Sequence, residues 1–112
     1  MKKLILLSLI LLTPVISIAQ SGIASYYGEQ HQGRLTASGK PFNMNALTAA
    51  HRTLPFGTKI RVKNLDNNKF VIVVINDRGP FIRNRVLDLS QSAAIKLDMI
   101  KSGTAKVNIK II

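Results

Sequence analysis

Residues 70–80 read Phe70-Val-Ile-Val-Val-Ile-Asn-Asp-Arg-Gly-Pro80 and carry the strongest structural signal in the chain. Six consecutive apolar residues, most of them β-branched, predict a strand that is buried on both faces. The chain becomes polar immediately afterwards, and Asp77 follows the strand with Arg78 beside it. Two interpretations of Asp77 remain open: an acid held against a ligand, or a turn residue that bonds its own backbone or pairs with Arg78.

The segments around this strand predict a small, mostly β domain. Residues 58–65 alternate apolar and basic side chains, and Asp66-Asn67-Asn68 is typical of a hairpin turn. The strands on either side of that turn should therefore be antiparallel neighbours. Residues 46–51 fit either a helical turn or a buried strand. Further strands are expected at residues 21–28, 86–89 and 105–111, and closure into a barrel would leave no exposed edge.

One helix and one long loop complete the prediction. Ser90 can cap a helix over about residues 90–101, and Gly103 is placed to end it. Residues 28–45 are rich in Gly, Ser, Asn and Gln, which predicts a surface loop. Loops of this length in a small domain are usually functional or disordered.

The N-terminus has the pattern of a signal peptide. Lys2 and Lys3 precede an apolar run, and Ser17-Ile-Ala19 supplies the small residues that a signal peptidase requires. We therefore expect cleavage of residues 1–19, leaving residues 20–112 as one exported, monomeric domain in the periplasm or cell envelope. An uncleaved membrane anchor is disfavoured, because the apolar run is shorter than the roughly 20 residues that span a bilayer. The sequence has no cysteine, so we expect neither a disulfide nor a lipid on cysteine.

The chain is strongly basic. Sixteen Lys and Arg against five Asp and Glu give a net charge of +11, and +9 remains without Lys2 and Lys3. An anionic envelope polymer or a membrane surface is the partner class that fits an exported protein. Export and the scarcity of aromatic residues argue against nucleic acid. The charge also has a simpler interpretation, solubility, because Lys59, Arg61 and Lys63 alternate with apolar residues on one strand face.

Few residues are available for acid–base chemistry, and Asp77 and His51 are the best pair. The other carboxylates are assigned to solvent-facing positions or, for Asp88, to the helix start, where a carboxylate favours the dipole. A structural role for His51 also remains open. The spacing of His and carboxylates predicts no metal site, and we expect no cofactor. Tyr26 and Tyr27 should point to opposite faces of their strand, one into the core and one free to stack on a ligand.

Several stretches together resemble the rare lipoprotein A (RlpA) family. They are Ala24-Ser-Tyr-Tyr-Gly28, Thr36-Ala-Ser-Gly39, residues 44–58 (Met-Asn-Ala-Leu-Thr-Ala-Ala-His-Arg-Thr-Leu-Pro-Phe-Gly-Thr), Ile75-Asn-Asp-Arg-Gly-Pro-Phe81 and Asp88-Leu-Ser90. The resemblance implies a six-stranded double-psi β-barrel, the fold of expansins and barwins. It also implies a lytic transglycosylase that cleaves the glycan strands of peptidoglycan and leaves 1,6-anhydro ends. The resemblance further implies a role in wall remodelling and daughter-cell separation, with septal proteins as candidate partners.

By the same resemblance, Asp77 matches the family's acid and His51 its Ala-Ala-His position. Tyr27, Lys40, Asn43 and Arg78 are then the expected substrate-binding residues. The sequence departs from the family after Thr-Ala-Ser-Gly, where active members usually carry a glutamate and, three residues later, an aspartate or similar polar residue. Lys40 and Asn43 occupy those positions here. The alternative is therefore an expansin-like barrel that binds peptidoglycan without cleaving it.

Overall fold

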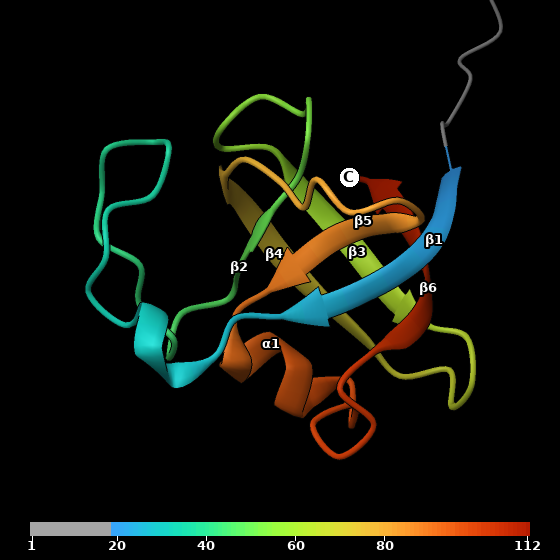
Figure 1. Ribbon diagram of the computed structural model, residues 1–112. Coiled ribbons are helices and arrows are strands. Elements are labelled where there is room, and N and C mark those ends of the chain that lie inside the picture. The colour runs from blue at the N-terminus through green and yellow to red at the C-terminus, as the bar shows by residue number, and fades with distance from the viewer. Residues whose placement is uncertain (1–18) are drawn as a thin grey trace, which may run out of the picture.

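The computed structural model describes residues 19–112, so the predicted signal peptide lies, apart from Ala19, outside the described residues. Within this range six strands form a closed barrel in the order β1-β5-β2-β4-β3-β6 (Figure 1). The elements are β1 (Ala19–Tyr26), the 3-10 helix η1 (Glu29–His31), β2 (Thr48–Ala50), β3 (Lys59–Asn64), β4 (Phe70–Asp77), β5 (Arg85–Leu89), α1 (Gln91–Lys96) and β6 (Ala105–Ile111). The predicted six-stranded barrel with one short helix is confirmed.

Two of the six strand pairings are parallel and shape the site. β1 runs parallel to β5, and β2 runs parallel to β4, while the remaining neighbours are antiparallel. Each parallel pair contains a register shift, in β1 between Ile23 and Ala24 and in β2 between Ala49 and Ala50. Such irregularities bend a strand and re-aim its side chains. The antiparallel pairing of β3 with β4 agrees with the prediction, and residues 46–51 contain a strand rather than a helical turn.

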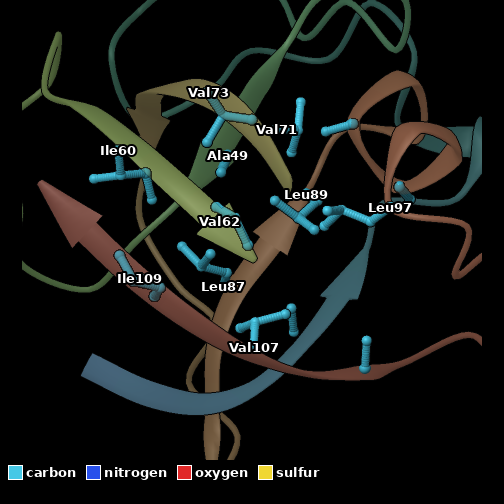
Figure 2. Close-up of a cluster of buried hydrophobic side chains, with 14 of the residues drawn as sticks. Ala49, Ile60, Val62, Val71, Val73, Leu87, Leu89, Leu97, Val107 and Ile109 are labelled. Carbon is cyan, nitrogen blue, oxygen red and sulfur yellow. The ribbon is translucent and has the colours of Figure 1, made fainter. Parts of the chain in front are cut away.

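The barrel interior is filled by alternate residues of the strands. Figure 2 shows the side chains that meet there, among them Ile60, Val62, Val73, Leu87 and Val107, all fully buried. Alternation on β3 leaves Lys59 and Arg61 exposed, as predicted, with Lys63 partly buried. Because the small barrel accepts one face of each strand, the opposite face is left outside.

The prediction that the 70–75 strand is buried on both faces is wrong. Phe70 is 57% exposed and Ile72 43% exposed on the outer side of β4. Their neighbours across the strand pair are the basic residues of β3, and the Arg61 guanidinium lies 5.6 Å from the centre of the Phe70 ring. The aliphatic stems of such cations cover apolar surface, so a strand in a barrel this small tolerates an outward-facing apolar row.

Helix α1 is shorter than predicted. Ser90 caps it as expected, its hydroxyl accepting from the Ala93 N–H. The helix ends because Asp98 adopts a left-handed conformation with φ of 55°, not because of Gly103. The N–H groups of Asp98 and Met99 then donate to the carbonyls of Ile95 and Ala94, an arrangement that closes helix C-termini. Asp98 thus follows the helix instead of lying on it. No helix within residues 19–112 is long and apolar enough to cross a membrane.

Candidate active site

The carboxylate of Asp77, at the end of β4, is held by three donors from separate segments. Oδ2 accepts from the Tyr27 hydroxyl at 2.5 Å, just after β1. Oδ1 accepts from the Ala37 N–H at 2.7 Å, in the long loop, and from the Arg78 N–H at 2.9 Å, in its own turn. Asp77 is therefore more than a turn residue, because it joins β4 to β1 and to the loop.

Tyr27 is packed as well as hydrogen-bonded. Its ring stacks on Phe42 with 4.5 Å between ring centres and meets the edge of His31 at 5.2 Å. Burial, then the hydrogen bond to Asp77 and the charges of Asp77 and Asp88, raise the pKa of the Tyr27 hydroxyl. The phenol therefore stays protonated and remains a donor to Asp77. Phe42 already occupies one face of the ring, so only the remaining surface is available for stacking on a sugar.

The two tyrosines divide as the strand alternation predicts. Tyr26 packs against the core, and its hydroxyl donates to the Ile100 carbonyl at 2.9 Å. Tyr27 faces the site.

The loop between η1 and β2 brings the departures from the family pattern to this site. Residues 34–42 form a small hairpin in which Leu35 bridges Pro41, and it lies beside the barrel in Figure 1. Phe42, 3% exposed, anchors the hairpin on Tyr27, and the Ala37 N–H anchors it on Asp77. Lys40 and Asn43 are exposed on this segment, and their predicted contact with substrate stays a prediction.

His51 is tied to Asp77 through its backbone and not through its ring. Its N–H donates to the Asp77 carbonyl at 3.1 Å. Its ring Nδ1 accepts from the N–H groups of Thr53 and Leu54, which places the ring hydrogen on Nε2, 3.0 Å from Gln20 Oε1. Burial, then the charges of Arg78 and Arg52, lower the pKa of His51. The neutral ring thus orders residues 51–54, and a catalytic role for it stays a prediction.

The side chain of Arg78, like the ring of His51, contacts other groups of the protein. Its Nη1 donates to the carbonyls of His51 and Leu54 at 3.2 and 2.8 Å, and its guanidinium lies 4.1 Å from the centre of the Phe56 ring. The side chain fastens the segment after β2 to the turn after β4. Its predicted substrate contact is not shown by these bonds and stays a prediction.

Asp88 is a member of the site that sequence reasoning missed. It was assigned to the helix start as a carboxylate that favours the dipole, but in the structure it accepts a hydrogen bond from the Ser25 hydroxyl on β1. Ala50 of β2 lies opposite Asp77 on one side and opposite Asp88 on the other. The signal was present in the alternation of residues 86–89, where Leu87 and Leu89 point inward and Asp88 therefore points out of the core.

The remaining acidic residues lie elsewhere. Glu29, Asp66 and Asp98 are exposed, and Asp98 pairs with Lys69 at 3.8 Å. Within residues 19–112 no three His, Cys, Asp or Glu side chains gather in a way that could hold a metal ion. The arrangement at Asp77 therefore offers a fixed carboxylate with a neutral phenol beside it, which is suited to proton transfer to and from an oxygen.

Comparison with known proteins agrees with the resemblance in the sequence. The family described as "Lytic transglycolase" matches residues 19–109. The "Probable endolytic peptidoglycan transglycosylase RlpA" of Treponema pallidum is 60% identical over 92 residues, covering 82% of this chain and 29% of that protein. The corresponding protein of Campylobacter jejuni is 51% identical over 100 residues, covering 88% and 36%. The chain thus spans about a third of the length of these relatives.

Solved structures support the fold. The Streptomyces papain inhibitor superposes with a TM-score of 0.68 at 24% identity, covering 88% of this chain and 97% of that one. An expansin of Clavibacter michiganensis superposes with a TM-score of 0.65 at 16% identity, covering 85% and 50%. The family match covers residues 19–109, and the strand order of the closed barrel agrees with it. The chain therefore belongs to the lytic transglycolase family of double-psi β-barrel domains, which includes the RlpA proteins.

Proposed function

We propose that this protein is a lytic transglycosylase that cleaves the glycan strands of peptidoglycan, with Asp77 as its acid. The observation that carries the proposal is the Asp77 carboxylate, both of whose oxygens are fixed by hydrogen bonds at the end of β4. The relatives are named endolytic peptidoglycan transglycosylases, which supports the reaction and the substrate class.

A single carboxyl group suffices for this reaction. Asp77 donates its proton to the glycosidic oxygen as the bond from that oxygen to the anomeric carbon breaks. The C6 hydroxyl oxygen of the muramyl sugar bonds to the anomeric carbon, and its proton returns to Asp77. No water is consumed, so the second carboxylate of hydrolytic glycosidases is not required. The Tyr27 hydroxyl stabilises the carboxylate that exists between the two proton transfers.

The neighbouring residues act as positioning residues in this proposal. His51 and Arg78 hold the turn through the Asp77 carbonyl and through the carbonyls of residues 51 and 54. Lys40 on the hairpin and Asn43 just after it contact the glycan.

The experiment is incubation of purified protein with glycan strands stripped of stem peptides, followed by mass spectrometry for 1,6-anhydro-muramyl ends. We expect such ends with the natural protein and none with Asp77→Asn. Asp66→Asn is the matched control, because it makes the same chemical change in an exposed hairpin turn and should leave turnover intact. Anhydro ends formed at an unchanged rate by Asp77→Asn would refute the assignment.

One observation favours a second candidate function, a barrel that binds peptidoglycan without cleaving it. The hairpin that touches Asp77 presents Lys40, a cation, at the position where the resemblance implies a carboxylate in active members of the family. In that case the protein sediments with the glycan strands but releases no anhydro ends. Lys40→Glu separates the two possibilities, because restoring the carboxylate should create cleavage in a binding-only barrel and only modulate it in an active enzyme.

We also propose that the protein acts outside the cytoplasm in the cell envelope. The basic and apolar pattern of residues 1–19 supports export. Fractionation of cells that produce the full-length chain tests this, and retention in the cytoplasm would contradict it.

A further inference from the structure

A groove of about 680 Å³ lies on the barrel away from the Asp77 carboxylate. It runs along β1 at Gly22 and Ile23, where β1 lies between β5 and β6, and Asp77 does not line it. Ile23, Val86 and Leu65, which is 44% exposed, give it apolar walls. Gly22 permits the close approach of β5 here, because a Cβ on Gly22 would meet Val86 Cγ1 at 2.3 Å. A volume in this range is typical of ligand sites.

The polar side of this groove is cationic. Arg83, Arg85 and Lys106 line it, together with Arg52, and no Asp or Glu does. Within residues 19–112 the only ion pair is that of Lys69 with Asp98, so none of the groove's cations has a carboxylate partner in the described part of the chain. Uncompensated like charges that converge on one hollow repel each other in the free protein and favour an anion there.

Arg52 gives this arrangement a rigid base. Its guanidinium donates to the carbonyls of Pro80, Ile82 and Arg85, at 2.7, 2.8 and 3.0 Å. These bonds fix the segment that carries Arg83 and Arg85, so the two guanidinium groups project from an ordered backbone. Preorganised cations bind an anion with less loss of conformational entropy than mobile ones.

The positive charge extends into a neighbouring hollow. A space of about 220 Å³, lined by Gln20, His51 and Thr53, shares Arg52, Arg85 and Val86 with the groove. Burial, and then the charges of Arg78 and Arg52, lower the pKa of His51, which lines this hollow.

We propose that this groove binds a chain-like polyanion, a polymer whose phosphate or carboxylate groups meet Arg83, Arg85 and Lys106. Non-polar parts of the polymer lie on the apolar walls. Arginine forks match both kinds of oxyanion. A recessed site admits a chain more readily than a flat lipid surface, which the cations could meet only at the rim. The site is independent of Asp77 and does not depend on cleavage.

The test compares two triple variants that remove the same charge. Arg83→Gln, Arg85→Gln and Lys106→Gln together empty the groove of three cations. Lys59→Gln, Arg61→Gln and Lys63→Gln together remove three cations from the outer face of β3, which does not line the groove. Both full-length variants are first checked for folding by circular dichroism and thermal unfolding. Binding of fluorescent polyphosphate and of fluorescent poly-L-glutamate is then measured by anisotropy over a range of salt concentrations.

We expect the groove variant to lose about tenfold or more in affinity for at least one polymer and the β3 variant to lose much less. The slope of log affinity against log salt should become shallower by roughly 2 for the loss of three contacts. The polymer whose affinity falls in the groove variant shows whether the groove recognises phosphate or carboxylate groups. Equal losses in both variants would overturn the proposal, because net charge alone would then explain binding. Binding confined to anionic lipid vesicles would overturn it too.

A measurement on the natural protein covers the case in which the groove variant does not fold. Titration of the isotope-labelled protein with polyphosphate and with poly-L-glutamate should shift the backbone amide signals of Gly22, Val86 and Lys106 before those of β3. Shifts centred on Lys59, Arg61 and Lys63 would overturn the proposal.

Discussion

Asp77 is held from three directions by donors that belong to other residues. Two of the donors are backbone N–H groups, of Ala37 and Arg78, and only the Tyr27 hydroxyl is a side chain. A substitution of Tyr27 can therefore remove one hydrogen bond that positions Asp77 while Asp77 itself stays in place.

Tyr27→Phe should lower turnover by about 10- to 100-fold while leaving glycan binding nearly unchanged, because the ring keeps its stacking on Phe42 and loses only its hydroxyl. Release of anhydro ends and co-sedimentation with glycan measure the two effects. Tyr26→Phe is the matched control, because its hydroxyl bonds the Ile100 carbonyl and not Asp77. Equal loss of turnover in both variants would assign the effect to packing.

His51 should make the protein less stable in mild acid. Its pKa in the folded state is lowered below the ordinary value of 6.5, so the unfolded chain takes up the proton more readily. The stability that the neutral ring contributes is complete above about pH 6.5 and is lost as the pH falls below it. Thermal unfolding of the natural protein at pH 7.5 and pH 5 should therefore show a lower Tm at pH 5.

His51→Asn should remove part of this pH dependence. An asparagine side chain can accept the same N–H groups of Thr53 and Leu54, as Asn64 does from the Asp66 N–H, but it does not titrate. The Tm of the variant relative to that of the natural protein should therefore be higher at pH 5 than at pH 7.5, because only the natural protein loses stability when residue 51 is protonated. A difference that is constant from pH 7.5 to pH 5 would contradict a buried neutral His51.

The sequence allowed the position of Asp77 to be predicted but not the direction of the His51 ring. A strand that ends in Asp77 is visible in residues 70–77. The ring direction depends on two N–H groups that a turn presents and on Gln20 from the far end of β1, and neither is visible from spacing. Asp88 was missed for a related reason, since its role depends on strand pairing with β1 and β2.

At the scale of elements, alternation predicted the strands well and their burial less well. Clean alternation gives β3 and β6 their inward faces. A continuous apolar run such as residues 70–75 has no alternation of apolar and polar side chains to tell the inner face of the strand from the outer face. Sequence alone therefore does not reveal that Phe70 and Ile72 face outward. The end of α1 was predicted too late in the sequence, because Asp98 was expected to continue the helix. In the structure Asp98 takes the left-handed conformation that glycine usually adopts at a helix end.

Ser90 links three elements, so Ser90→Ala should destabilise the fold by about 2 kcal/mol. Its hydroxyl donates to the Ala46 carbonyl at 2.6 Å and accepts from the N–H of Ala93, and the residue is fully buried. Removal leaves the Ala46 carbonyl without this donor and uncaps α1. Urea unfolding measures the loss, and Ser92→Ala, two residues along the same helix and only partly buried, should change stability far less.

At the scale of the whole molecule, closure means that no strand of the barrel lies at an edge. β6 comes last in the chain, yet it pairs with β1 on one side and with β3 on the other. Closure was predictable from the number of strands and the lack of an obvious edge strand. The strand order was not, because parallel pairs such as β1 with β5 join residues far apart in sequence.

Asn108→Pro should therefore cost about 3 kcal/mol or more, although Asn108 lies only four residues before Ile112. Asn108 lies opposite Ser21 on β1 and Lys63 on β3, so a proline there interrupts the ladder within the sheet. Asn108→Ala, which keeps the N–H, is the control and should be nearly neutral. Chemical unfolding that finds the two variants equally stable would mean that β6 is not held on both sides.

Pairing of Ala19 with Lys110 places the first and last strands of the barrel side by side. Tyr27, at the other end of β1, lies on the order of 20 Å along the strand from that point. A polypeptide joined to either end of the barrel would therefore leave it at one place, at the end of β1 that lies away from Tyr27. The barrel can therefore be inserted into a longer chain, or have its ends exchanged by circular permutation, through one junction region beside Ala19 and Lys110.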